Sequence, residues 1–168
     1  MKTSKKTIYL TGFMGAGKST VGKLLAQKLG LGFIDLDDYI EEKSGKTIPE
    51  IFTDSGEACF RNLESEALRE VSVKTAVIST GGGVTEKEEN RKLMKRTGTV
   101  FFLDAPFYVL YERIRDDKNR PLARGEKEVL RERYENRRPG YEWAALTLDT
   151  KGCSPYEVVQ KALQHFDE

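Results

Sequence analysis

The sequence predicts an α/β fold in which a parallel sheet is covered by helices on both faces. Short apolar runs alternate along the chain with longer segments of helical periodicity, as in repeated strand–helix units. Most of these runs are apolar at consecutive positions, which is typical of strands that are buried on both faces. The length of 168 residues suits one domain, and we expect residues 1–168 to form a single domain.

The expected elements follow one another along the whole chain. Five runs are predicted to be strands: residues 7–11, 32–35, 76–80, 99–104 and 145–149. Eight segments are predicted to be helices: residues 18–29, 37–44, 49–52, 57–73, 86–96, 106–115, 126–138 and 155–166. Pro106 and Pro155 stand where a first helical turn tolerates proline, and Ser154 is a suitable N-cap for the last helix.

Composition argues against several classes of protein. The chain has 28 basic and 27 acidic residues, a net charge of +1, whereas nucleic-acid and membrane-surface binders usually show a large basic excess. No segment approaches the roughly 18 apolar residues of a membrane span. The two cysteines, Cys59 and Cys153, are too few for a disulfide scaffold or a zinc cluster. We therefore expect a cytoplasmic monomer that binds neither nucleic acid nor membranes.

A phosphate-binding loop is predicted directly after the first strand. Gly-Phe-Met-Gly-Ala-Gly-Lys-Ser at residues 12–19 matches the pattern G-x-x-x-x-G-K-[ST] and opens the first helix. Glycines let backbone N–H groups surround phosphate oxygens, and the helix N-terminus adds a partial positive charge. A lysine and a hydroxyl in this motif serve the β and γ phosphates and Mg²⁺, respectively. The residues expected to bind ATP here are Gly12, Gly15, Ala16, Gly17, Lys18, Ser19 and Thr20.

Two carboxylates follow the second expected strand. Asp35 and Asp37 are two residues apart, so on an extended chain they would point to the same side. In an open parallel sheet, ligands bind beyond the carboxyl ends of the strands. We expect Asp35 to hold Mg²⁺ through a water molecule and Asp37 to face an acceptor hydroxyl. The alternative is that carboxylates here cap the next helix, and we expect Asp38 to be that cap.

A second glycine-rich segment ends the third expected strand. Gly81, Gly82 and Gly83 are consecutive, and three glycines in a row carry a large conformational cost in a folded chain. We therefore expect a ligand to pack against their backbone at the mouth of the sheet. The alternative is a plain turn before a helix that Thr85 could cap.

Several arginines have no evident structural partner in the sequence. Arg61 borders the apolar face of its helix, where Glu64 is placed to orient the guanidinium. Arg137 and Arg138 precede Pro139. Guanidinium groups suit a carboxylate ligand because they can bind it with two hydrogen bonds. The alternative for each arginine is an ordinary solvated charge.

Residues 112–138 are unusually charged, with ten Lys or Arg and seven Asp or Glu. Turn-forming residues lie near residues 116–121 and 123–125. One interpretation is a solvated helix pair with salt bridges. The other is a mobile lid that brings arginines onto phosphate.

Together these motifs resemble those of the shikimate kinase family. They appear in the family's order and spacing at residues 12–19, 35–37, 60–64, 81–83, 120–122 and 137–141. The resemblance implies a P-loop kinase fold of the nucleoside monophosphate kinase-like type: a five-stranded parallel sheet flanked by helices, with a lid. The lid would span about residues 116–126 and the shikimate-binding region about residues 37–64. It also implies transfer of the ATP γ-phosphoryl group to the 3-hydroxyl of shikimate, in chorismate and aromatic amino acid biosynthesis, with ATP and Mg²⁺ as cofactors.

The resemblance also implies roles for single residues. Those implied to be catalytic are Lys18, Asp37 and Arg120, and those implied to bind shikimate are Asp37, Arg61, Gly81, Gly82, Gly83 and Arg137. Arg113 would pack on the adenine, Arg120 would reach the ATP phosphates, and Pro155 would belong to the adenine loop. Arg138 is expected to be a solvated or lid-facing charge. One departure is Gly140, where the family usually has leucine.

Two other functions remain as alternatives. A gluconate or nucleoside monophosphate kinase would share the P-loop and lid, but would not require residues 35–37, the three glycines and Arg61 together. A non-catalytic or switch-type nucleotide binder is the second alternative. The Asn-Lys-x-Asp motif of guanine-specific proteins does not occur in the sequence.

Overall fold

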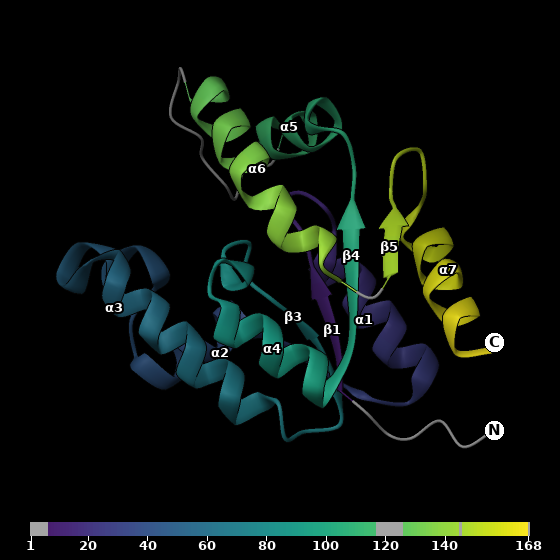
Figure 1. Cartoon of the computed structure of the whole chain (residues 1–168), viewed down its shortest axis with the longest axis horizontal. Coiled ribbons are helices and arrows are strands. Elements are labelled where there is room, and N and C mark those ends of the chain that lie inside the picture. Colours follow the sequence, from purple (N-terminus) through teal and green to yellow (C-terminus); the bar gives the residue numbers. More distant parts are fainter. Residues whose placement is uncertain (1–6, 117–125, 145, 168) are drawn as a thin grey trace.

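A computed structural model describes residues 7–116, 126–144 and 146–167 of the chain. Its centre is a parallel sheet of five strands in the order β2-β3-β1-β4-β5. The strands are β1 (Thr7–Thr11), β2 (Gly32–Asp35), β3 (Ala76–Ser79), β4 (Gly98–Asp104) and β5 (Leu146–Asp149). Because all five run in the same direction, their carboxyl ends meet at one edge of the sheet, at the arrow tips in Figure 1.

Helices cover both faces of this sheet (Figure 1). They are α1 (Lys18–Leu29), α2 (Leu36–Ser44), α3 (Ile48–Val71), α4 (Glu88–Thr97), α5 (Phe107–Arg115), α6 (Lys127–Glu142) and α7 (Pro155–Asp167), with a short 3-10 helix, η1 (Val84–Glu86). Helix α1 packs beside α7, and α3 packs beside α2 and α4. Within the described ranges, no helix has both the length and the apolar character needed to cross a membrane.

Strand side chains alternate between two apolar layers. Ile8 and Leu10 of β1 pack in one layer with residues of α1 and α7, whereas Tyr9 packs in the other with residues of α2, α3 and α4. All three side chains are buried. Burial on both faces explains why the strand runs are apolar at successive positions.

Most predicted elements are confirmed, with β1, β2 and α1 matching residue for residue. The two helices predicted at 49–52 and 57–73 are parts of α3, which kinks at Gly56 with φ 81°. The helix predicted at 86–96 starts instead as η1 and resumes as α4 after Lys87, whose backbone is extended. Thr85 is therefore not a helix cap, because it lies inside η1.

Helix α6 continues through Pro139 to Glu142, beyond the predicted end at residue 138. A proline inside a helix removes one backbone hydrogen bond and crowds the preceding turn. The following turn is held by Tyr141, which is 1% exposed and stacks on Phe102 with 5.2 Å between ring centroids. Its hydroxyl also donates to the carbonyl of Gly82. Tertiary packing thus overrides the local signal for a helix end.

Candidate active site

The loop between β1 and α1 has the backbone form that the phosphate-binding motif requires. Gly12, Gly15 and Gly17 have φ values of 146°, 83° and 92°, which other residues rarely adopt. A Cβ atom at Gly12 would also lie 2.6 Å from the carbonyl oxygen of Leu103. Among the described residues no side chain caps the N-terminus of α1, so its first N–H groups can bind an anion.

Lys18 and Ser19 begin α1 directly below this loop. The Lys18 ammonium donates to the carbonyl of Gly12 and, at 3.2 Å, to that of Phe13, so it lies across the loop. The Ser19 hydroxyl donates to Oδ2 of Asp35 at 2.8 Å. A hydroxyl and a carboxylate from two neighbouring elements therefore meet beside the phosphate-binding loop.

Asp35 also caps helix α2, since its Oδ1 accepts the backbone N–H of Asp38 at 3.1 Å. The prediction that Asp38 is the cap is therefore wrong. The chain turns helical at Leu36, one residue earlier than predicted, so the cap moves back to the last strand residue. The period-two argument that paired Asp35 with Asp37 fails for the same reason, because Asp37 lies in the helix.

Asp37 nevertheless lies at the carboxyl edge of the sheet. Its Oδ1 is 3.1 Å from the point that a Cβ atom of Gly81 would occupy. Burial raises the pKa of Asp37 above the ordinary carboxyl value, and the negative charge of Asp35 raises it further, while Lys18 opposes both. The side chain is thus a carboxylate of increased basicity within the electrostatic reach of the lysine.

The three glycines lie where side chains from other elements come close. A Cβ atom at Gly82 would be 3.2 Å from Nη1 of Arg137, and one at Gly83 would be 2.6 Å from Cζ of Arg61. None of the three has a positive φ. A side chain at these positions would displace the ends of neighbouring charged side chains, whereas the backbone conformation itself does not demand glycine. Protein side chains thus approach this backbone closely, and the packing of a ligand against it stays a prediction.

Arg61 and Arg137 converge beside these glycines, with side chains that are only 14% and 11% exposed. Arg61 donates from Nη1 to Glu64 Oε1 at 3.0 Å. Arg137 donates from Nε to Glu86 Oε1 at 3.2 Å, while the other Glu86 oxygen lies 3.8 Å from Nε of Arg61. One carboxylate thus bridges the two guanidinium groups.

Glu64 is the most buried acid of this cluster, at 1% exposure. Burial raises its pKa above the ordinary value, although the nearby charge of Arg61 acts in the opposite direction. Its Oε2 has no hydrogen-bond partner within the described parts of the chain. The site therefore holds its arginines with a carboxylate that is itself costly to keep ionised.

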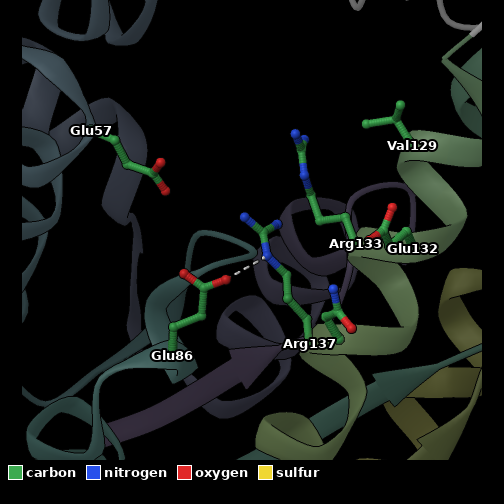
Figure 2. Close-up of a pocket in the computed structure, with 7 residues that line it drawn as sticks. Glu57, Glu86, Val129, Glu132, Arg133 and Arg137 are labelled. Carbon is green, nitrogen blue, oxygen red and sulfur yellow. Dashed lines mark hydrogen bonds and ion pairs between the residues drawn. The ribbon is translucent and has the colours of Figure 1, made fainter.

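A pocket of about 300 Å³ opens between α3, η1 and α6 (Figure 2). Its lining residues are Glu57, Glu86, Val129, Glu132, Arg133, Asn136 and Arg137. In Figure 2, Arg133 and Arg137 extend from α6 into the space that faces Glu57. The pocket is polar, charged and adjacent to the two bridged arginines.

Comparison with known proteins gives this geometry its context. The family model for shikimate kinase matches residues 14–167. The chain belongs to the shikimate kinase family. It is 45% identical to a shikimate kinase from Persephonella marina over 159 residues, 94% of this chain and 97% of that protein. It is 43% identical to one from Bacillus anthracis over 164 residues, 97% and 99% of the two chains.

Solved structures of the family superpose over nearly the whole chain. The structure of shikimate kinase from Acinetobacter baumannii in complex with shikimate has a TM-score of 0.89 at 41% identity, covering 96% of this chain and 92% of that one. The shikimate kinase from Bacteroides thetaiotaomicron has a TM-score of 0.90 at 39% identity, covering 97% and 99%. The predicted P-loop kinase fold is therefore confirmed.

Within this family member, Arg113 lies between the phosphate-binding loop and the segment before α7. Its Nη1 donates to Gly15 O at 3.1 Å, and its Nη2 donates to Thr150 O at 3.3 Å. Pro155 starts α7, and Ser154 caps it by accepting the backbone N–H of Glu157 at 3.2 Å, as predicted. Arg113 thus connects the phosphate-binding loop to the segment that leads to Pro155.

Arg138 corrects one prediction, because it is not a solvated or lid-facing charge. It donates to both oxygens of Asp104, from Nη1 at 2.8 Å and from Nη2 at 2.7 Å, and also to the hydroxyl of Tyr134 at 2.6 Å. Asp104 ends β4, and its backbone carbonyl accepts the N–H of Thr150 at 2.8 Å. Arg138 therefore ties α6 to the sheet edge.

Arg120 and most of the predicted lid fall outside the residues that the structure describes. The sequence analysis did not predict a role for Glu86. The one feature of the sequence that could have indicated it is its position three residues after the last of the three glycines. At Gly140, a Cβ atom would lie 3.1 Å from Oγ1 of Thr85, so the absence of a side chain lets α6 approach η1.

Proposed function

We propose that this chain transfers the γ-phosphoryl group of ATP to the 3-hydroxyl of shikimate, giving shikimate 3-phosphate and ADP for chorismate and aromatic amino acid biosynthesis. The observation that carries the proposal is the meeting, at one sheet edge, of the phosphate-binding loop, the carboxylate of Asp37 and the pair Arg61 and Arg137. Membership of the family, whose A. baumannii structure is a complex with shikimate, supports this acceptor.

On the nucleotide side, backbone N–H groups of residues 12–17 and of the first turn of α1, which includes Ser19 and Thr20, would surround the phosphates. Lys18 would exchange its contacts with loop carbonyls for the β and γ phosphates. Arg113 and Pro155 would flank the adenine, and Arg120 would contact the phosphates from the lid.

Ser19 and Asp35 are the residues that would hold Mg²⁺. Their hydroxyl and carboxylate oxygens lie 2.8 Å apart, and oxygen donors of this kind suit Mg²⁺, which usually keeps several water ligands. When bound, the ion neutralises phosphate charge. The two oxygen donors therefore suit a Mg²⁺ site with few protein ligands, in which water and the nucleotide would supply the remaining ligands.

On the acceptor side, Arg61 and Arg137 would bind the carboxylate of shikimate, and Asp37 would bind its hydroxyls. The backbone of residues 81–83 would lie beside the ring. Because its pKa is raised, Asp37 is a better proton acceptor than an ordinary carboxylate, and we assign it the proton of the 3-hydroxyl.

Phosphoryl transfer demands little covalent chemistry from the protein. Catalysis would come from aligning the 3-hydroxyl with the γ phosphate and from cations placed around the transferred group. Lys18 and Arg120 would supply two of those cations. Closure of the lid would exclude the water that could otherwise hydrolyse ATP.

The decisive experiment measures ADP release with shikimate, gluconate or AMP as the acceptor, at matched concentrations. Release that depends on shikimate alone supports the proposal. Release with gluconate or AMP would assign the chain to another group of P-loop kinases, and release with none of the three would favour a non-catalytic nucleotide binder.

We further propose that the protein works as a cytoplasmic monomer. ATP is a cytoplasmic metabolite, and every group invoked above belongs to one chain, so the site needs no second copy. Sedimentation or light scattering would test the oligomeric state directly, and a dimer at working concentrations would contradict it.

A further inference from the structure

The positive charges of Arg61 and Arg137, the two arginines assigned to the acceptor, are already largely balanced by protein carboxylates. Arg61 lies 3.0 Å from Glu64 and 3.6 Å from Glu57, and it shares Glu86 with Arg137. Three carboxylates thus surround two guanidinium groups. A carboxylate ligand that enters this cluster would find well-oriented hydrogen-bond donors. It would find little positive charge that is not already balanced by a protein carboxylate.

Arg133 lines the pocket between α3, η1 and α6 together with Arg137, whereas Arg61 lies beside that pocket and is not part of its lining. Arg133 precedes Arg137 by four residues on α6, so the two side chains rise from the same helix face, about 5–6 Å apart at their Cβ atoms. Figure 2 shows it directed into the space between α6 and Glu57. Among the residues that the structure describes, it has no hydrogen-bond or ion-pair partner, unlike Arg137.

We propose that Arg133 is a further acceptor-binding residue, which supplies the uncompensated positive charge that makes the pocket select anionic acceptors. Arg61 and Arg137 would fix the geometry of the bound carboxylate, and Arg133 would favour its negative charge. This inference rests on the proposed function, because it concerns the acceptor of that same reaction.

The pocket size and the local charges set the expected magnitude. The pocket has a volume of about 300 Å³, at the lower end of the range for small-molecule sites, and it adjoins the assigned acceptor residues through Arg137. Hydrogen bonds to charged groups are worth roughly tenfold or more in affinity. The side chain of Arg133 is exposed to solvent, and Glu132 beside it is negatively charged. Both factors weaken the electrostatic effect of Arg133 on a ligand. We therefore expect loss of Arg133 to lower kcat/KM for shikimate by about tenfold, the lower end of the range for hydrogen bonds to charged groups.

The test compares two acceptors, shikimate and its uncharged methyl ester, in the wild type and in Arg133→Ala. We expect the variant to lose about tenfold in kcat/KM for shikimate and less than about twofold for the ester, with an unchanged KM for ATP. Arg133→Lys should recover part of the loss, because it keeps the charge without the planar fork.

Arg131→Ala is the matched control, because it removes one positive charge from the same helix. The Arg131 guanidinium lies 5.2 Å from the Phe107 ring centroid and is not part of the pocket lining. Equal losses for the two acceptors, no loss, or the same loss in Arg131→Ala would each overturn the role of Arg133. Failure of the wild type to phosphorylate shikimate would instead overturn the proposed function and this inference with it.

Discussion

Arg61 and Arg137 owe their orientation to carboxylates of α3 and η1. Burying a guanidinium group is costly unless it is paired, and both side chains are less than 15% exposed. Glu86 contacts both groups through their Nε atoms, at 3.8 and 3.2 Å. The hydrogen bond from Nε of Arg137 to Glu86 and that from Nη1 of Arg61 to Glu64 orient the two guanidinium groups, which lowers the entropy that a ligand must remove.

Arg137→Ala should therefore affect the acceptor far more than the nucleotide. Loss of a charge-assisted contact of roughly 1.5–3 kcal/mol predicts a decrease of about 10- to 150-fold in kcat/KM for shikimate. Steady-state kinetics with each substrate varied in turn measures both effects. A comparable rise in the KM for ATP would place this arginine at the phosphates instead.

Asp37→Asn separates a proton acceptor from a structural carboxylate. The exchange is nearly isosteric, so a structural role would tolerate it, whereas loss of general-base assistance typically costs about 10²–10⁴-fold in kcat. Because the pKa of Asp37 is raised, the wild-type rate should fall with decreasing pH from a point above the ordinary carboxyl range. The variant should lack this acidic limb. Asp38→Asn, an exposed neighbour on α2, is the control.

The same variant should be more stable than the wild type at neutral pH. A folded-state pKa above the unfolded value means that folding favours the protonated form, so ionisation destabilises the fold. This penalty is absent below the unfolded pKa, builds up as pH rises to the folded pKa, and is complete above it. Thermal unfolding at pH 7 should therefore show a higher Tm for Asp37→Asn. A lower Tm would mean that the carboxylate makes a stabilising contact.

At the scale of elements, two adjacent residues of helix α6 contact two different parts of the molecule, η1 and the end of β4. Successive helical side chains point about 100° apart. Arg137 accordingly reaches Glu86 of η1, whereas Arg138 reaches Asp104 at the end of β4. Adjacent arginines in the sequence therefore serve different purposes, with the second one docking the helix on the sheet.

Arg138→Ala should consequently destabilise the fold. Asp104 is only 18% exposed in its side chain and would lose both guanidinium hydrogen bonds. We expect a decrease of about 1–3 kcal/mol in the free energy of unfolding, measured with urea. Glu142→Ala removes an exposed partner of the same arginine and should cost under about 0.5 kcal/mol. Equal costs would show that the Asp104 pair contributes nothing beyond a surface contact.

For the whole molecule, the features predicted from sequence are those with local causes. The strand runs, the glycine motif and the N-cap Ser154 are set by residues close in the chain, and they match the structure. The end of α6 was mispredicted because the packing of Tyr141 on Phe102 depends on residues about forty apart in sequence. The partners Glu86 and Asp104 were missed for the same reason, since ion pairs between distant elements leave no local pattern.

The arrangement also divides the site into two halves that ligands should stabilise independently. Lys18 belongs to the nucleotide half, at the loop after β1, whereas Arg61 and Arg137 line the acceptor half. A ligand at 100 times its Kd adds about 2.7 kcal/mol to the folded state, or roughly 5–10 °C in Tm for a chain of this size. In thermal melts, ATP with Mg²⁺ and shikimate should each raise the Tm of the wild type. Lys18→Ala should lose most of the shift caused by ATP and keep the shift caused by shikimate, and loss of both would mean that the lysine supports the fold of the whole site.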